Sequence, residues 1–419
     1  MRASWRDKRD TATLRLFYGL FFLLPLTAVF GHRGVAPWLL IASFPAFLRG
    51  DFWQAAFGKL FDHPSVREPV FAGLAAIAAL SAWIAISAVW SPRHMPELAF
   101  YILAPALVGG SVVWFSMNLT REWAWRLGRA FLLAIVGGML VLSFEGVTDG
   151  VLRRLLPPPE TGPRDIVALG RGVTALAPAL FPAAAIAVRQ WSRSAALGVL
   201  ALGVAAAVTN DVLANVVAIG FGLAAALIAL NAQKTVLVLA GWGAVALLVL
   251  TPFAALLIPV DAIYDWAAAQ TPHAQEMMAS SLHRLAVWKS VAGKSFSCLP
   301  FGCGADYARV WKETAPMIEV PGSAIELSIM PTHPHNGFLE IWLELGVPGV
   351  VFTALFLYVG LRSLLRAQLS KAVGAAAAGA FVAILVSVMI EASIWQVWRL
   401  AAMALAAAGV ALAHGLEKR

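Results

Sequence analysis

Charge is scarce in this 419-residue chain: Asp, Glu, Lys and Arg make up 13% of it, while 60% is hydrophobic and the mean hydropathy is +0.78. Soluble globular proteins carry about 25% charged residues, so this composition excludes that class. The chain also lacks a sequence repeat, a low-complexity tail and a soluble domain beyond one large loop. No cleavable signal peptide is evident, because the first apolar run follows several Arg and Lys residues and is typical of a signal anchor.

Long uncharged runs recur from end to end. Each spanning helix needs roughly 20 apolar residues, and in lipid such runs must be helical to satisfy their backbone polar groups. The sequence therefore predicts an all-α fold, a polytopic membrane helix bundle of about 12 transmembrane helices, as a single integral membrane domain over residues 1–419. The expected spans are Leu14–Phe30, Val35–Leu48, Pro69–Val89, Leu98–Met117, Ala130–Val147, Val173–Val188, Ala195–Thr209, Val212–Leu230, Val236–Val260, Phe338–Gly360, Val373–Ile390 and Leu400–His414.

The placement of Lys and Arg predicts the orientation, because cytoplasmic segments retain more of them. With the N-terminus in the cytoplasm, alternate segments on that side hold the larger share of the 31 basic residues. We therefore expect an inner-membrane protein with both termini in the cytoplasm. Residues 261–336, between the ninth and tenth spans, are expected to form a helical loop on the periplasmic face. The net charge of +8 then mostly reflects topology, and no nucleic-acid partner is expected.

Four arginines depart from this bias. They lie in the predicted outer loop before the sixth span, around three consecutive prolines, and are Arg153, Arg154, Arg164 and Arg171. A guanidinium group matches phosphate bidentately, and each charged hydrogen bond contributes roughly 1.5–3 kcal/mol. The cluster therefore predicts an anionic partner. Anchoring to lipid head groups, or pairing with nearby Asp and Glu side chains, is the alternative.

Clustered carboxylates are missing. No Asp-x-Asp pair occurs, and the acids of the outer loop are scattered. Because a catalytic Mg²⁺ or Mn²⁺ generally needs such a cluster, we expect no metal and no cofactor. The two cysteines, Cys298 and Cys303, fall in the outer loop, where the periplasm permits a disulfide. Both a disulfide and a pair of buried thiols remain open, whereas two cysteines alone are not expected to bind zinc.

The most reactive residue lies where the large loop meets the tenth span. His335 can take and return a proton near neutral pH, and Asn336 follows it. Two carboxylates of the same span, Glu340 and Glu344, lie one helical turn apart. Carboxylates inside a membrane are usually functional or paired.

Upstream in the loop, residues 280–288 are expected to form a short amphipathic helix that lies along the membrane. A serine cap precedes its apolar positions, and Arg284 shares a face with Trp288. A tight turn is predicted where Gly302 and Gly304 follow.

Taken in order, these motifs resemble the O-antigen ligase and polymerase superfamily over roughly residues 281–360. The motifs are Arg284 with Trp288, then Gly302-x-Gly304, then His335-Asn336 followed by Gly346-x-x-Gly349. The resemblance implies a GT-C-like glycosyltransferase of the bacterial inner membrane that needs no nucleotide sugar. Its implied partners are O-antigen on undecaprenyl diphosphate as donor, lipid A–core oligosaccharide as acceptor, and the membrane lipids.

On this resemblance, His335 is hypothesised to be the base that deprotonates the acceptor hydroxyl, in one displacement that inverts the anomeric carbon. Arg284 and the four-arginine cluster are expected to stabilise the leaving diphosphate. Asn336 is expected to orient His335 or a sugar hydroxyl. Glu340 is a candidate for orienting His335 or binding acceptor, with pairing inside the bundle as the alternative. Gly346 and the glycine three residues later are expected to allow close helix packing beneath the site.

The chain departs from the family at the entry to the span near Val212. Family members commonly carry a Ser-Arg-Gly-like turn there, whereas this sequence has Thr209-Asn210-Asp211. If that arginine binds diphosphate elsewhere in the family, another residue must do so here. The four-arginine cluster is the first candidate, and Arg93, in the preceding outer loop, is the second.

Three chemistries compete within the superfamily: ligation of the glycan to lipid A–core, polymerisation of repeat units, and transfer to a protein hydroxyl. Because polymerases match the His335-Asn336 pattern less well and the chain ends just beyond its last span, O-antigen ligase is favoured. From another class, a lipid or solute transporter is the alternative. The lack of an internal repeat and the concentration of polar residues on one face weigh against it.

Overall fold

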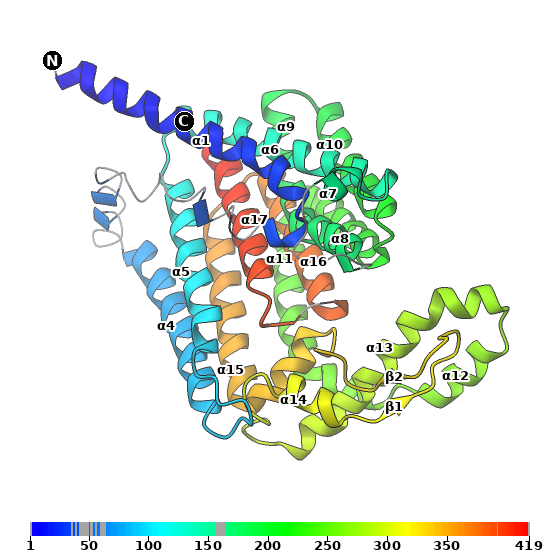
Figure 1. Cartoon of the computed structure of the whole chain (residues 1–419). Coiled ribbons are helices and arrows are strands. Elements are labelled where there is room, and N and C mark those ends of the chain that lie inside the picture. The colour runs from blue at the N-terminus through cyan, green and yellow to red at the C-terminus, as the bar shows by residue number, and fades with distance from the viewer. Residues whose placement is uncertain are drawn as a thin grey trace.

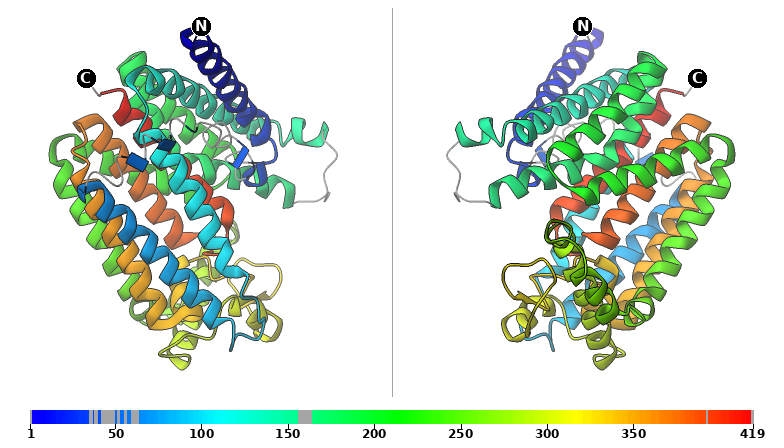
Figure 2. Two further views of the ribbon diagram at one scale, coloured as in Figure 1. Left: turned by 90° about the vertical axis from the view of Figure 1, so that its left-hand side faces the viewer. Right: turned by 90° about the vertical axis from the view of Figure 1, so that its right-hand side faces the viewer.

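The computed structural model describes residues 2–34, 64–155, 164–391 and 393–417, together with a few isolated residues between 35 and 63. It is a bundle of long helices. Both termini lie at one end of the bundle, and the segment 261–336 lies at the other (Figures 1 and 2). The expected span Val35–Leu48 falls almost wholly outside the described residues.

In the part of the chain that the structure describes, eight long helices run through the bundle. They are α1 (Arg2–Ala28), α4 (Pro64–Ser87), α5 (Leu98–Met117), α6 (Arg121–Val147), α11 (Leu213–Leu256), α15 (Gly337–Arg366), α16 (Lys371–Ile390) and α17 (Val397–Gly415). Shorter elements complete the chain. They are α7 (Val151–Leu155), α8 (Arg164–Leu176), the 3₁₀ turn η1 (Ala177–Ala179), α9 (Leu180–Gln190), α10 (Arg193–Thr209), α12 (Val260–Ala268), α13 (Pro272–Ser297), α14 (Tyr307–Thr314), β1 (Met317–Ile318) and β2 (Leu327–Ser328).

Nine helical stretches among the described residues are long and apolar enough to cross a membrane, and α10 is a shorter apolar helix. This confirms the all-α polytopic class predicted from composition. One of the nine is the whole of α11, which has 44 residues and would be about 66 Å long if straight.

The chain instead reverses direction inside α11. Ala232 has non-helical backbone angles (φ −131°, ψ 44°). Gln233 lies against Gly374 near the start of α16, and contacts on both sides of it step away along α16, from Gly222 to Gly379 and from Thr251 to Met389. The two arms of α11 therefore run antiparallel, and they correspond to the expected spans Val212–Leu230 and Val236–Val260.

The expected span Val173–Val188 is also interrupted. Pro178 lies in η1, between α8 and α9, where its missing N–H ends one helix and starts the next. The stretch Val167–Gln190 is the most enclosed of the apolar stretches described, and 89% of an 18-residue segment within it is buried. Its enclosure places α8 and α9 at the centre of the helix packing.

Side-chain caps and small residues explain where the helices begin and how closely they pack. Thr120, Ser192, Thr271 and Ser370 each accept a hydrogen bond from a backbone N–H in the first turn of the following helix. Along α16, buried alanines and glycines bring neighbouring backbones close, which is typical of helix packing in membranes.

The loop 261–336 folds against one end of the bundle. It contains α12, α13 and α14, and a two-stranded antiparallel hairpin in which Met317 pairs with Ser328 and Ile318 with Leu327. Its buried face includes Val287 and Val291 of α13, which pack with Leu339 and Leu343 of α15. The loop is therefore joined to the helix that follows it by an apolar core.

Candidate functional site

His335 lies at the junction of the loop and α15. Its backbone is left-handed, with φ 54°, and Asn336 directly precedes the helix. The Asn336 side-chain oxygen accepts hydrogen bonds from the N–H groups of Phe338 (3.0 Å) and Leu339 (3.1 Å). Asn336 is thus the N-cap of α15, and this bonding holds the start of the helix beside His335. Its expected contact with substrate stays a prediction.

The imidazole of His335 is half enclosed. Its Nδ1 atom is buried and has no hydrogen-bond partner among the described residues, so the open side of the ring is that of Nε2. Burial, together with the positive charges of neighbours that include Arg284 and Arg171, lowers the pKa of His335 to about 4. The ring is therefore neutral at neutral pH, with a lone pair available to accept a proton.

Two guanidinium groups reach the surroundings of His335 from different elements. Arg284 comes from α13 and Arg171 from α8, and both are part-buried and close enough to affect the pKa of His335. Burial lowers the pKa of Arg284 itself, and the carboxylate of Glu391 opposes that shift. Neither guanidinium has a hydrogen bond or salt bridge to a protein group within the described residues. Both keep their donors available for an anion.

The four arginines predicted to act as a cluster have different surroundings. The Arg153 guanidinium lies over the Phe30 ring, 5.4 Å from its centroid, and Arg154 donates to the backbone oxygen of Asp149 (2.6 Å). Arg164 opens α8, and its side chain is outside the described part of the chain. Of the three side chains described, Arg171 is the one whose charge lowers the pKa of His335.

Arg93, the second candidate for an anion contact, forms an ion pair. Its Nε lies 3.3 Å from Asp306, and Arg309 lies 3.1 Å from the other oxygen of the same carboxylate. Burial raises the pKa of Asp306, and the two arginines oppose that shift. Arg93 therefore links the α4–α5 connection to the start of α14.

The turn at Thr209–Asp211, which lacks the family's arginine, lies beside α8. The side chain of Asn215 donates to the backbone oxygen of Gly170 (3.1 Å), and a Cβ on Gly170 would meet Val212. Arg171 directly follows Gly170, so this arginine is presented from the helix next to that turn.

The two carboxylates of α15 bind protein groups. Glu340 accepts hydrogen bonds from the Ser393 hydroxyl (2.9 Å) and the Ile394 N–H (2.6 Å). Glu344 accepts from the N–H groups of Asp306 (2.7 Å) and Ala308 (3.1 Å) and from the Trp395 indole (2.7 Å). Both are fully buried. They tie α15 to the α16–α17 connection and to α14, which matches the alternative of pairing within the bundle; a direct role of Glu340 in binding acceptor stays a prediction.

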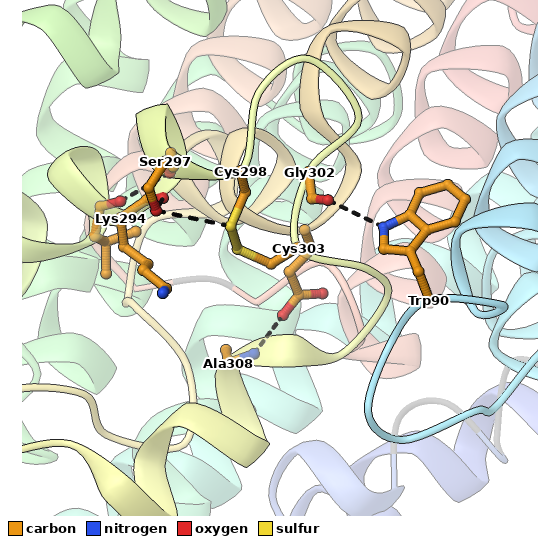
Figure 3. The surroundings of a disulfide bond; sticks show 10 residues. Trp90, Lys294, Ser297, Cys298, Gly302, Cys303 and Ala308 are labelled. Atoms are coloured by element: carbon orange, nitrogen blue, oxygen red, sulfur yellow. Dashed lines mark hydrogen bonds between the residues drawn. A yellow bond between two sulfur atoms is a disulfide. The ribbon is translucent and has the colours of Figure 1, made fainter.

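A disulfide between Cys298 and Cys303 closes a small ring, which settles the alternatives left open by the sequence. The predicted turn at Gly302 and Gly304 is confirmed, because both glycines have positive φ. Figure 3 shows the ring and the Gly302 carbonyl that accepts from the Trp90 indole (3.0 Å).

This ring packs against a break in α15. Gly346 has φ 59°, and a Cβ there would overlap Gly302 and the Pro300 oxygen. The break frees backbone oxygens of α15, and the N–H groups of Cys303 (2.7 Å) and Gly304 (3.0 Å) bond to two of them. Gly346 therefore allows the backbone of α15 to contact the disulfide ring of the loop. The helix packing expected of this glycine from the sequence stays a prediction.

The amphipathic helix expected at residues 280–288 is part of a longer one. α13 begins at Pro272 and is capped by Thr271, so the predicted serine cap is wrong, because the helix continues back through Ser280. Trp288 is partly buried in the core of the loop, and its indole donates to the backbone oxygen of Pro334 (3.0 Å).

Sequence reasoning missed the contribution of the α16–α17 connection. The Arg399 side chain is buried and bonds to Gln396, Ser387 and the backbone oxygen of Glu391, with the Glu391 carboxylate 3.5 Å away. Arg399 also lowers the pKa of His335. An arginine inside an apolar span is the sequence signal that would have indicated it.

Within the described residues, no group of three or more His, Cys, Asp or Glu side chains is arranged to hold a metal ion. A cavity of about 530 Å³ lies between α5, α11, α15, α16 and α17, with an apolar lining that reaches His414. None of the candidate site residues lines it.

Comparison with known proteins supports the assignment suggested by the motifs. Residues 179–354, from η1 through the first half of α15, match the family described as O-antigen ligase. The match includes Arg284 and His335 but ends before Arg399.

Three relatives are provisionally described as polysaccharide ligases. Those of Rickettsia typhi and Rickettsia felis are 32% identical over 120 residues, and that of Rickettsia conorii is 31% identical over 120 residues. The shared segment covers 28% of this chain and 28–29% of each relative, so it spans less than a third of their length. Residues 179–354, less than half of this polytopic membrane protein, are therefore similar to the O-antigen ligase family.

Proposed function

We propose that this protein transfers O-antigen from undecaprenyl diphosphate to a sugar hydroxyl of lipid A–core on the periplasmic face of the inner membrane. The observation that carries the proposal is a neutral His335 with two guanidinium groups, Arg284 and Arg171, near enough to lower its pKa and without a hydrogen bond or salt bridge to protein in the described part of the chain. A proton acceptor and two anion-binding groups at one place are what the reaction requires.

The acceptor oxygen attacks the anomeric carbon of the donor sugar. A new carbon–oxygen bond forms as the bond from that carbon to the diphosphate breaks, and the electron pair leaves with undecaprenyl diphosphate. The acceptor proton passes to Nε2 of His335, a contribution of typically 10²–10⁴-fold in rate. A single displacement inverts the anomeric configuration.

Arg284 and Arg171 act on the leaving group. Fixed guanidinium donors stabilise charge as it develops on the diphosphate, and they need no reorganisation during the step. The bound diphosphate also affects His335: its negative charge opposes the two arginines and raises the histidine pKa from about 4. The base is therefore stronger in the donor complex than in the free enzyme.

The proposed orientation has both termini in the cytoplasm and the transfer site on the periplasmic face. The arrangement of both termini at one end and the loop 261–336 at the other supports cytoplasmic termini and a periplasmic site (Figure 1). His335 and Arg284 belong to the loop end of the bundle.

The test is transfer by purified protein in proteoliposomes supplied with a lipid-diphosphate-linked glycan and rough lipopolysaccharide. We expect glycan on lipid A–core with inverted anomeric linkage, at the same rate with and without EDTA. Elongated lipid-linked glycan in place of modified lipopolysaccharide would identify a polymerase and overturn the proposal. Loss of transfer with EDTA would overturn its metal independence.

A further inference from the structure

The conformation of His335 needs to be held by its neighbours. A residue with a Cβ pays roughly 1–2 kcal/mol for left-handed backbone angles, and such angles persist where surrounding contacts enforce them. Neighbouring residues on both sides are restrained: Trp288 bonds to the Pro334 oxygen, and Asn336 caps α15. These contacts leave the backbone N–H of His335 itself to be satisfied.

His333 supplies that contact. Its Nδ1 accepts a hydrogen bond from the His335 backbone N–H (3.2 Å). The two imidazole rings are inclined to each other by 54°, with their centroids 4.3 Å apart. An Nδ1 that accepts carries no proton, so the ring hydrogen of His333 is on Nε2. Burial lowers the pKa of His333 to about 2, which keeps the ring in this neutral form.

The α16–α17 connection contacts His333 from the other side. The amide nitrogen of Gln396 lies 3.5 Å from Nε2 of His333. Both nitrogens carry hydrogen when Nδ1 is the acceptor, so this is a packing contact and not a hydrogen bond. The Gln396 oxygen in turn accepts from Arg399 and from the Ser393 N–H. Since Glu340 bonds to Ser393, this connection is anchored to α15, the helix that starts beside His335.

We propose that His333 is a positioning residue of the transfer site, which holds His335 in its left-handed conformation through Nδ1. The inference rests on the proposed function for its kinetic consequence, but the geometry it describes does not. Gln396 and Arg399 lie outside residues 179–354, so the site is completed by a part of the chain beyond the family match.

The kinetic test uses three variants of His333. In His333→Ala the contact is lost, and a misplaced base is expected to reduce kcat by about 10²-fold with little change in the KM for donor. In His333→Asn the side-chain oxygen replaces Nδ1 as acceptor, and kcat should stay within about threefold of wild type. His333→Gln extends the acceptor beyond the Nδ1 position and should behave like His333→Ala. Equal loss in the Asn and Ala variants, or no loss in His333→Ala, would overturn the positioning role.

A second measurement does not depend on transfer. Protein labelled with ¹⁵N-histidine and reconstituted in lipid should show, at pH 7, a His333 ring with bare Nδ1 and protonated Nε2, assigned by its absence from His333→Ala. The backbone ¹⁵N signal of His335, assigned in the same way, should move toward that of an N–H without an acceptor in His333→Ala and should stay near its wild-type position in His333→Asn. A proton on Nδ1 of His333 would overturn the inference even if the protein transfers glycan. The expected spectrum from a protein that transfers none would overturn the proposed function alone.

Discussion

A sequence motif shows the identity and the position of His335, but not its conformation or its contacts. Its identity and its position between the large loop and the following span are visible in the sequence, as are Arg284 and the glycines. Its left-handed backbone and its buried Nδ1 are seen only in the structure, where Trp288 bonds to Pro334 and Gln396 lies against the His333 ring, both from distant segments. Such long-range contacts leave no local periodicity in the chain, so they were not predicted.

The pKa of His335 determines the expected pH dependence of the reaction. His335 in the free protein has its pKa lowered from 6.5 to about 4, so it stays neutral as the pH falls from 7 to 5. We expect kcat/KM for the donor, which reports the free enzyme, to be level over that range and to fall near pH 4. A decline centred at pH 6.5, measured from initial rates in proteoliposomes, would contradict the burial of this ring.

The same shift affects stability. Between pH 6.5 and 4 the unfolded chain binds a proton at His335 that the folded protein does not. The folded state therefore loses stability as the pH falls through this window, and it regains it as the pH rises.

Replacing an arginine by lysine separates charge from geometry. Arg284→Lys and Arg171→Lys keep the positive charge but lose the planar pair of donors that fits phosphate. We expect kcat/KM for the donor to fall about tenfold or more in each. Arg154→Lys is the matched control, because Arg154 is exposed and bonds to Asp149, and it should change little. Full activity of both site variants would show that neither arginine binds the donor through its paired guanidinium donors.

At the scale of elements, the sequence located most helices well. The expected Leu98–Met117 coincides with α5. α16 begins two residues before its expected span, after the cap Ser370, and α6 begins nine residues before its own, after the cap Thr120. The sequence did not predict the break of α15 at Gly346 against the disulfide ring, because two glycines far apart in sequence make that contact.

The break in α15 gives a stability prediction. In Gly346→Ala the new Cβ overlaps Gly302 and the Pro300 oxygen in a left-handed conformation, so we expect a loss of about 2 kcal/mol or more. Gly360→Ala in the same helix is the control. A Cβ at Gly360 has nothing within 4 Å, so its melting temperature should match or slightly exceed that of wild type. Equal melting temperatures for the two variants in detergent would show that the contact with the ring is unimportant.

At the scale of the whole molecule, composition was sufficient to predict the all-α polytopic class, whereas the orientation expected from the basic residues stays a prediction. Apolar length located the two arms of α11 as separate spans, and a sharp turn at Ala232 separates them. The number of spans stays a prediction, because Val35–Leu48 falls almost wholly outside the described residues and α10 is short.

The orientation has a direct test in intact cells. The native cysteines form a disulfide, so a single added cysteine is the reactive thiol among the described residues. Ala324→Cys, in the exposed part of the large loop, should react with a membrane-impermeant maleimide. Ser194→Cys, exposed in the first turn of α10, should react after lysis alone. The reverse pattern would place the site on the cytoplasmic face.

The central claim is that transfer takes place at His335, and the most direct test compares two histidine variants in the proteoliposome assay. His335→Ala should lose about 10²–10⁴-fold in the rate of glycan transfer to rough lipopolysaccharide while the protein remains folded. His273→Ala, at an exposed position in α13 of the same loop, should transfer at the wild-type rate. A wild-type rate in His335→Ala would contradict the account.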